Sequence, residues 1–214
     1  MLWRMLMASF WETLLMVGVS VALALVGGLP LGVLLVTTSP GNITPNMAVY
    51  KVLSTVVNIG RSIPFIILMV AIIPFTRMIV GTSIGTTAAI VPLTVAAIPF
   101  VARIVESALR DVDRGVVEAA QAMGASPWQI ISKVLLPEAL PTLVLGVTIT
   151  AVNLIGYSAM AGAIGGGGLG DLAIRYGYQR FRGDVMLMTV IVLILLVEIV
   201  QAVGDWAAES LNKK

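Results

Sequence analysis

The chain contains no cysteine and no histidine, and it has few charged residues. The first absence excludes disulfide frameworks and thiol chemistry, and the second removes the commonest metal ligand. Charged residues make up 11% of the 214 positions, against about 25% in ordinary soluble chains. The net charge is only +2, and no run of Lys or Arg occurs, so nucleic acid is not an expected partner. With a mean hydropathy of +1.02, the composition predicts a protein of the lipid bilayer.

Long apolar runs predict about five transmembrane helices. The runs cover residues 13–38, 62–80, 84–102, part of 139–170, and 185–204. Each approaches or exceeds the roughly 20 residues that a helical span requires. The first run is longer than the apolar core of a signal peptide, about 7–15 residues, so it is expected to remain as a span. Membrane strands would alternate polar and apolar residues, so the prediction is an all-α membrane protein with residues 1–214 as one transmembrane domain. The short 81–83 connection predicts that the second and third spans form a helical hairpin.

Residues 103–138 form a polar segment between apolar runs, and they are predicted to form two short helices. Gly115 is expected to cap the first helix, and Gly124 is expected to end it in a left-handed conformation. Ser126, Pro127 and Gln129 have the spacing of a capping box with proline at the first helical position, so the second helix is expected to begin there.

The second of these helices is expected to run to Leu136 and to stop at Pro137. Ala119, Ala120 and Ala122 keep one side of the first helix slim, so that another surface can approach its backbone. The pair therefore suits a groove on a partner protein. The alternative is an amphipathic pair of helices that lies on the membrane surface.

The spacing within this segment also resembles a known family. Three elements carry the resemblance: the triplet that begins at Glu118, then Gly124, and the Val134–Pro137 stretch. They are similar to the motif of permease subunits of binding-protein-dependent ABC importers of type I, with Val134 in place of isoleucine. Segments 58–67, 80–85 and 156–160 resemble the methionine permeases of that family. In those permeases the motif forms a cytoplasmic coupling helix in a cleft of the ATPase subunit. The resemblance therefore assigns ATPase coupling to eight residues, namely Gly115, Glu118, Ala119, Ala120, Gly124, Val134, Leu136 and Pro137.

The resemblance further implies a set of partners and a location. The chain is expected to form a homodimer in the bacterial inner membrane, with two ATPase subunits and an external substrate-binding protein. No G-x-x-x-x-G-K-[ST] phosphate loop occurs in the sequence, so ATP and Mg are expected on the partner ATPase, and the chain is expected to have no catalytic, cofactor or metal site of its own. An odd number of spans puts the two termini on opposite sides, and the resemblance implies that the loop with the motif is cytoplasmic, so the N-terminus is expected outside and the C-terminus inside. The positive-inside rule agrees, with eight Lys and Arg residues assigned to the inside and five to the outside.

The fourth span is expected to line the translocation path. Asn153, Tyr157, Ser158 and Met160 lie there among small residues, which allow membrane helices to approach closely. Two copies that meet at this span would form a narrow and mostly uncharged gate. Met160 is either the flexible plug of that gate or a packing residue of a helix interface.

Glu198 is the charged residue that stands out inside a span. Gln201 and Asp205 follow it on the same helical face, so the three form a polar stripe. The stripe either relays protons or faces neighbouring helices, and Arg61 or Arg103 is the expected partner of Glu198.

Together these features predict the permease subunit of an ATP-driven amino-acid importer, with methionine as the substrate. One alternative is a permease of the same superfamily for another small amino acid. A different class, an ion-coupled secondary carrier, is disfavoured because the sequence shows no inverted repeat.

Overall fold

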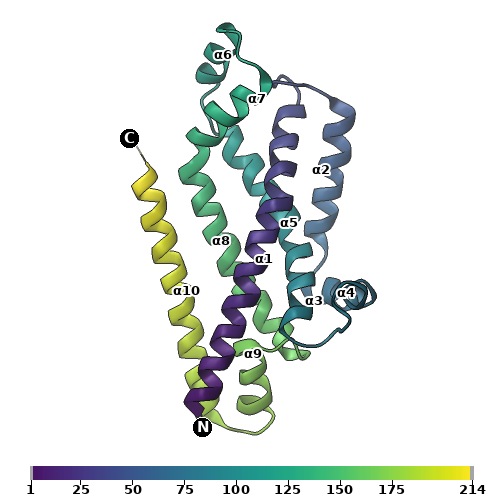
Figure 1. The fold of residues 1–214 in the computed structure, drawn as a ribbon, viewed down its shortest axis with the longest axis vertical. Coiled ribbons are helices and arrows are strands. Elements are labelled where there is room, and N and C mark those ends of the chain that lie inside the picture. Colours follow the sequence, from purple (N-terminus) through teal and green to yellow (C-terminus); the bar gives the residue numbers. More distant parts are fainter. Residues whose placement is uncertain (1, 213–214) are drawn as a thin grey trace.

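The computed structural model describes residues 2–212 and is built from helices, with no strand in that range. Lys213 and Lys214, two of the positive charges assigned above to the inside, lie outside the described residues. The helices, drawn in Figure 1, are α1 (Leu2–Thr38), α2 (Met47–Ser62), α3 (Phe65–Ala71), α4 (Ile73–Val80), α5 (Thr86–Arg110), α6 (Arg114–Ala122), α7 (Pro127–Ile130), the π-helical η1 (Ile131–Leu135), α8 (Leu136–Ala163), α9 (Gly168–Leu172), the π-helical η2 (Ala173–Tyr178) and α10 (Gly183–Leu211).

Four of the five predicted spans are confirmed. The helices Leu2–Thr38, Thr86–Arg110, Pro127–Ala163 and Gly183–Leu211 are long and apolar enough to cross a membrane. Each extends beyond its predicted run at one end or both, because helix caps and polar end turns carry no hydropathy signal. The fourth helix ends at Ala163, and a glycine-rich loop then leads into the short α9.

The second span differs from its prediction in both bounds and shape. The span is a broken pair, Met47–Ser62 and Phe65–Ala71, bent by 99°. Pro64 causes the break, because it has no N–H and excludes the helical conformation at Ile63, whose φ and ψ are −81° and 122°. Hydropathy missed the first half because α2 carries polar and charged residues on one face.

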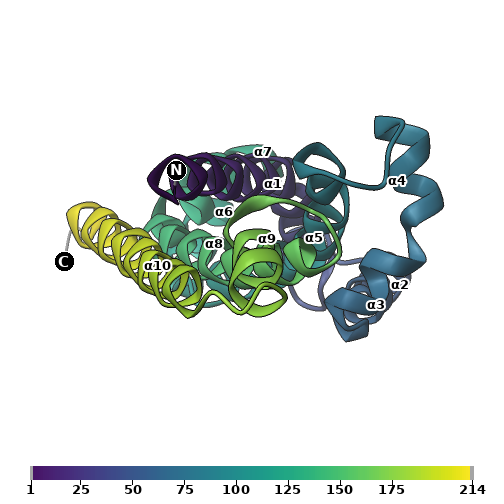
Figure 2. The same ribbon diagram turned by 90° about the horizontal axis from the view of Figure 1, so that it is seen from below.

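The predicted hairpin of two full spans is therefore not formed. Its turn is present, with left-handed glycines at Gly81 and Gly85. However, α4 is only eight residues long. It lies across the bundle, since it is seen nearly end-on in Figure 1 and along its length in Figure 2.

The predicted helix end at Pro137 is also wrong. The chain continues from α7 through η1 into α8, so Pro137 lies in the first turn of a long helix. The Leu136 N–H bonds to the Ile131 carbonyl, five residues back. This wider π turn accommodates a proline that would clash with the preceding turn of a regular α-helix.

Two glycines allow a close helix contact between α1 and α5. A Cβ on Gly28 would lie 2.7 Å from the Val101 side chain and 2.9 Å from the Ile98 carbonyl oxygen. A Cβ on Gly32, one helical turn further on, would lie 2.7 Å from the Ala102 carbonyl oxygen. Small residues spaced in this way let two membrane helices pack backbone against backbone.

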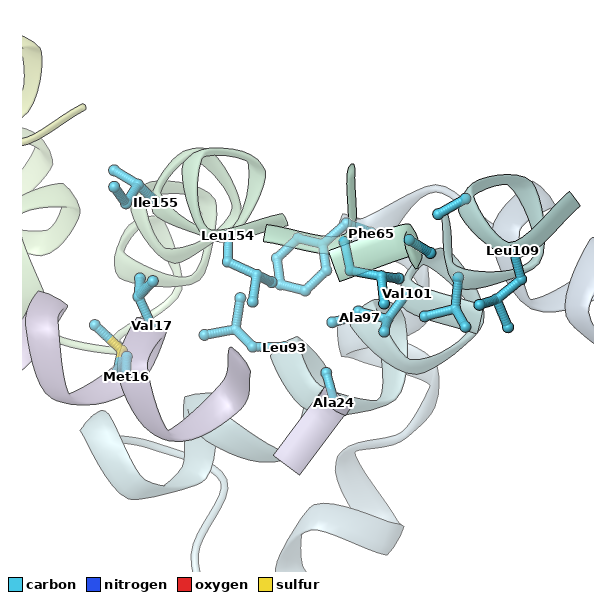
Figure 3. Close-up of a cluster of buried hydrophobic side chains, with 14 of the residues drawn as sticks. Met16, Val17, Ala24, Phe65, Leu93, Ala97, Val101, Leu109, Leu154 and Ile155 are labelled. Carbon is cyan, nitrogen blue, oxygen red and sulfur yellow. The ribbon is translucent and has the colours of Figure 1, made fainter. Parts of the chain in front are cut away.

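The core lies where α1, α5 and α8 meet, with α3 at its edge. Figure 3 shows Met16 and Val17 of α1 close to Leu93 of α5 and Leu154 of α8, all of them buried. Phe65 of α3 reaches into the same cluster. By contrast, α10 lies at the margin of the bundle (Figure 2), and most of its large apolar side chains are exposed, as suits contact with lipid.

The two ends of the described chain point in opposite directions. The N-terminal end of α1 lies far from α6 and α7, whereas α10 runs from that end toward the α6 and α7 end (Figure 1). This arrangement is the one expected from an odd number of spans.

The α1–α5 contact leads to a first prediction. Replacing Gly32 by Ala should lower the free energy of unfolding by about 1–3 kcal/mol, because the added methyl meets backbone that cannot move aside. Gly18→Ala is the matched control, since it lies on the same helix with no atom within 4 Å of a Cβ. Its effect should be neutral or stabilising by up to about 1 kcal/mol. Denaturant titration in mixed micelles measures the free energy of unfolding of both variants. Equal changes in the two variants would refute the close contact.

Candidate functional site

The predicted polar segment protrudes at one end of the molecule as the pair α6 and α7 (Figure 1). The first cap differs from the prediction. Asp113, not Gly115, is the N-cap residue of α6, and its Oδ1 accepts a hydrogen bond of 2.7 Å from the Gly115 N–H. An aspartate side chain satisfies a free helical N–H and favours the positive end of the helix dipole, which glycine cannot do.

The break between the two helices is as predicted. Gly124 has φ of 77°, in the left-handed region. Its N–H bonds to the Gln121 carbonyl at 2.9 Å, and the Ala125 N–H bonds to the Ala120 carbonyl at 3.1 Å. These two bonds form a Schellman motif, which fixes the direction in which the chain leaves α6.

The start of α7 also confirms its prediction. The Ser126 Oγ accepts from the Gln129 N–H, and the Gln129 Oε1 accepts from the Ser126 N–H at 2.8 Å. This is a complete capping box, with Pro127 at the first helical position. Helix, left-handed glycine and capped helix therefore form one locally determined bend.

The exposed surface of this bend differs in part from the predicted one. Ala120 is buried in the core, so it supports the bend from inside instead of lining its outer side. Two apolar side chains that the sequence did not single out are the most exposed: 82% of Met123 and 72% of Trp128 are accessible. The other motif positions fall into two groups: Gly115, Glu118, Ala119, Gly124 and Pro137 are exposed, and Val134 and Leu136 are half-buried.

A polar cavity of about 440 Å³ lies beside α6, under the loop that joins α1 to α2. Glu118 lines it, together with Arg110 and Arg114. The Glu118 carboxylate of the motif pattern therefore shares a cavity with two arginines.

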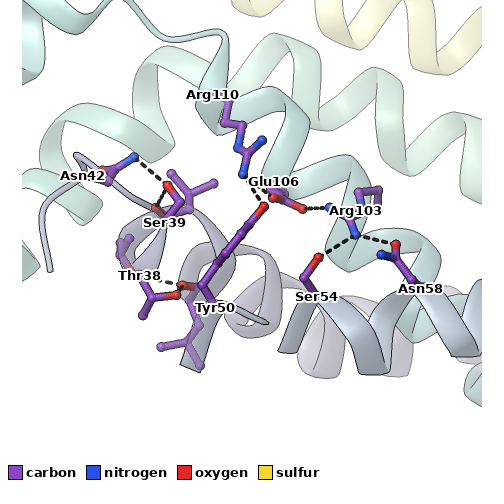
Figure 4. Close-up of polar contacts among 12 residues, drawn as sticks. Thr38, Ser39, Asn42, Tyr50, Ser54, Asn58, Arg103, Glu106 and Arg110 are labelled. Atoms are coloured by element: carbon purple, nitrogen blue, oxygen red, sulfur yellow. Dashed lines mark hydrogen bonds and ion pairs between the residues drawn. The ribbon is translucent and has the colours of Figure 1, made fainter. Parts of the chain in front are cut away.

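A buried carboxylate near the same end was not predicted. Glu106 of α5 is 1% exposed and lies between Arg103 and Arg110, one turn before and one turn after it (Figure 4). Arg103 forms a close ion pair with Oε2, and Arg110 Nη2 lies 2.7 Å from Oε1 without hydrogen-bond alignment. The spacing of Arg, Glu and Arg at i−3 and i+4 was a signal from which this cluster could have been found.

The same cluster joins α5 to α2 (Figure 4). Arg103 donates to Asn58 Oδ1 at 2.6 Å and to Ser54 Oγ at 3.3 Å. Arg110 donates to the Tyr50 hydroxyl at 2.9 Å. The polar face of α2 thus packs against the charged end of α5, close to the start of α6.

The prediction that Arg61 or Arg103 pairs with Glu198 is wrong. Arg103 is engaged by Glu106, and α2, which carries Arg61, packs on α1 and α5 and not on α10. Glu198 itself is exposed on α10. Within the predicted stripe, Gln201 Nε2 donates to Asp205 Oδ1 at 2.9 Å.

Three of the four predicted path residues share one face of α8. Asn153 and Met160 are exposed, Tyr157 is half-buried, and their i, i+4, i+7 spacing puts them on one stripe. Ser158 lies elsewhere: it is buried, and its hydroxyl donates to the Ile155 carbonyl of its own helix at 2.7 Å. Tyr157 stacks on Phe65 of α3, with ring centroids 4.6 Å apart.

A second unpredicted carboxylate holds the opposite end together. Glu12 of α1 accepts the Gly168 N–H at 2.7 Å, and Thr13 Oγ1 accepts the Leu169 N–H at 2.9 Å. These bonds satisfy the free N–H groups at the start of α9. The glycine-rich loop is thereby fixed to α1.

The sequence matches the family described as "Binding-protein-dependent transport system inner membrane component" over residues 28–214. The chain belongs to this family. One relative is the probable D-methionine transport system permease protein MetI of Vibrio cholerae. It is 60% identical over 201 residues, which cover 94% of this chain and 89% of the relative. The methionine import system permease protein MetP of Bacillus subtilis is 48% identical over 181 residues, covering 85% and 82%.

A solved structure supports the fold assignment of the chain. It was described as an inward-facing conformation of the MetNI methionine ABC transporter. One of its chains superimposes with a TM-score of 0.97 at 53% identity, covering 98% of this chain and 97% of the other. The fold is therefore that of a type I ABC importer permease, as predicted.

The buried cluster of Glu106 with its two arginines leads to a second prediction. Glu106→Ala should lower the free energy of unfolding by roughly 3 kcal/mol, because it leaves Arg103 and Arg110 without their shared counter-charge. Glu209→Ala removes the same side chain from an exposed position on α10 and should change stability by less than about 0.5 kcal/mol. Similar losses in the two variants, measured by denaturant titration, would contradict the role of Glu106.

Proposed function

We propose that this chain is the permease subunit of an ATP-driven importer and forms the transmembrane pathway for methionine. The observation that carries the proposal is the match over nearly the whole chain to a structure described as a methionine ABC transporter. The names of the Vibrio cholerae and Bacillus subtilis relatives support the same substrate. They disfavour the alternative of another small amino acid, and membership of the family disfavours an ion-coupled carrier.

In this proposal the whole chain, residues 1–214, acts as one transmembrane domain within a larger assembly. Two copies form a homodimer with two ATPase subunits, and an external binding protein delivers the substrate. ATP and Mg bind to the ATPase partner, which supplies the hydrolysis. The end that carries α6 and α7 faces the cytoplasm, so the N-terminus is outside and the C-terminus inside the bacterial inner membrane.

The bend of α6 and α7 is the proposed contact with the ATPase. It protrudes from the bundle, its backbone is fixed by the Schellman motif and the capping box, and it exposes Met123 and Trp128 at its surface. Exposed apolar and aromatic side chains at a rigid protrusion suit a well-packed protein interface. The motif residues contribute the bend itself (Gly124), the exposed face of α6 (Gly115, Glu118, Ala119) and its support (Ala120, Val134, Leu136, Pro137).

The experiment that tests the coupling role compares wild type with Gly124→Asp. Each chain is co-expressed with its ATPase subunit, and ATP hydrolysis is measured with and without methionine-loaded binding protein. Aspartate tolerates the left-handed conformation better than most residues, and open space surrounds Gly124. The variant should therefore fold, but its carboxylate should lower binding-protein-stimulated hydrolysis about tenfold or more.

Gly81→Asp is the matched control for this experiment. Gly81 is also left-handed, with φ of 81° and no atom within 4 Å of a Cβ, but it lies between α4 and α5. It should co-purify with the ATPase and hydrolyse ATP at the wild-type basal rate. If the two variants have the same binding-protein-stimulated ATP hydrolysis, α6 and α7 are not the docking element. If wild type hydrolyses ATP but ignores methionine, the substrate assignment fails and the permease assignment stands.

Met160 is proposed as the gate of the pathway, because its side chain is 47% exposed on the same face of α8 as Asn153 and Tyr157. Met160→Ala should raise basal ATP hydrolysis or passive leak of the assembled complex by several-fold, since a shorter side chain leaves the path open. Met188→Ala, which shortens a methionine 50% exposed on α10, is the control. Unchanged leak and unchanged basal hydrolysis in Met160→Ala would exclude the gate.

A further inference from the structure

The break between α2 and α3 leaves a charged side chain on the wall of a cavity. The cavity has a volume of about 200 Å³ and lies between α2, α3, α5 and α8. Arg61, in the last turn of α2, lines it together with Thr150, Asn153 and Tyr157 of α8. The guanidinium therefore shares a cavity with two residues of the proposed pathway.

Arg61 lies deep within the span. The preceding residue, Gly60, packs on Pro99, with 3.0 Å between the position of a Cβ and the proline ring. Pro99 is near the middle of α5 (Thr86–Arg110), and α2 ends about halfway along α1 in Figure 1. A cation at that depth is costly in lipid, and such residues face cavities or partners and mark sites of function.

The other arginines near this part of the chain have acceptors. Arg103 and Arg110 flank Glu106, and Arg77 donates to Ser83. Within residues 2–212, the Arg61 side chain has no hydrogen bond and no ion pair. Its five N–H donors are thus available to a ligand that enters the cavity.

Beside Thr150 and Asn153, the rest of the lining is mainly aromatic and apolar. The rings of Phe65 and Tyr157 are stacked, with 3° between their planes, and Phe100 of α5 completes the wall. A thioether makes favourable contacts with aromatic rings, as do other apolar side chains. The lining therefore combines a cation that suits an anion with rings that suit an apolar side chain.

We infer that this cavity is a transient binding site for the transported amino acid, with its carboxylate on Arg61 and its side chain against Phe65, Phe100 and Tyr157. This inference rests on the proposed import of methionine and adds a site at which the pathway recognises the solute. A guanidinium holds a carboxylate through two parallel hydrogen bonds. Because Arg61 is exposed and the cavity is open, the site binds weakly, as a pathway that must release its solute requires.

Transport per ATP hydrolysed tests the role of Arg61. The complex of this chain with its ATPase is reconstituted in proteoliposomes with methionine-loaded binding protein, and uptake and hydrolysis are measured on the same vesicles. Arg61→Met should keep binding-protein-stimulated hydrolysis within about twofold of wild type while methionine uptake per ATP falls about tenfold, the loss expected for one charged hydrogen-bonded contact. Arg61→Lys keeps the charge without the planar fork and should give an intermediate value.

Lys51→Met is the matched control, because it removes one exposed cation from the other end of the same helix. It should transport as wild type does. Wild-type uptake per ATP in Arg61→Met would overturn the inference. A loss of complex assembly or of stimulated hydrolysis in Arg61→Met would overturn it as well, since it would assign Arg61 to contacts between subunits.

Photolabelling tests the site directly. A methionine analogue with a photoreactive diazirine side chain, added at millimolar concentration to the complex without binding protein, should label the peptides that contain Phe65 or Phe100. Labelling should be competed by L-methionine but not by L-methioninol, which lacks the carboxylate, and it should fall about tenfold in Arg61→Met. Equal competition by the two compounds, or equal labelling of the variant, would overturn the inference. If wild type neither takes up methionine nor is labelled, the proposed substrate fails instead.

Discussion

The close contact of α1 with α5 at Gly28 and Gly32 is the constraint on which the rest of the molecule depends. The two glycines leave no Cβ on the α1 side of the crossing, so α5 lies directly against α1. Because one face of α5 packs on α1, its other faces can contribute to the cavity and to the cluster with α2. One part of its surface brings Ala96 and Phe100 to the cavity, and its polar end brings Glu106 to the cluster with α2. Without that crossing, neither the cavity nor the start of α6 would have a fixed position.

Charge within the spans follows one physical rule. In lipid an ionised group must be paired, hydrogen-bonded or hydrated, since its desolvation costs several kcal/mol. Glu106 is ion-paired with two arginines, and Glu12 accepts a hydrogen bond from the Gly168 N–H. Arg61 meets the rule differently, because it faces an open cavity. Charged side chains that have partners within the chain, such as Glu106, stabilise the bundle. Among the described residues, Arg61 has no such partner and is available to a solute.

Local features were predictable from sequence, and features that depend on distant residues were not. The left-handed Gly124 and the Ser126 capping box are determined by residues within one helical turn, so spacing alone predicted them. The predicted cap at Gly115 was wrong because Asp113, two residues earlier, supplies a carboxylate that accepts the Gly115 N–H. Hydropathy found the four continuous spans.

The second span and the buried carboxylate were missed for a common reason. The polar residues of α2, among them Tyr50, Ser54 and Asn58, kept it out of the predicted spans. These three side chains accept hydrogen bonds from Arg103 and Arg110 of α5. A hydropathy window counts such residues against a span, whereas packing on a second helix makes them compatible with it. Glu198 was selected for the opposite reason: it interrupts an apolar run, but its helix lies at the margin, where the side chain remains exposed.

The continuity of α7, η1 and α8 gives the proposed importer a direct mechanical connection. The helix Pro127–Ala163 begins in the bend that is proposed to contact the ATPase and ends beyond Asn153, Tyr157 and Met160. A helix without a loop cannot absorb a displacement of its first turn except by bending, and the π segment 131–135 is the place where its hydrogen bonding is already altered. Motion of α7 is therefore either transmitted to the path-lining face of α8 or taken up at η1. Since Tyr157 stacks on Phe65, movement of α8 also changes the cavity that Arg61 lines, so one helix joins the proposed ATPase contact, the gate and the solute site.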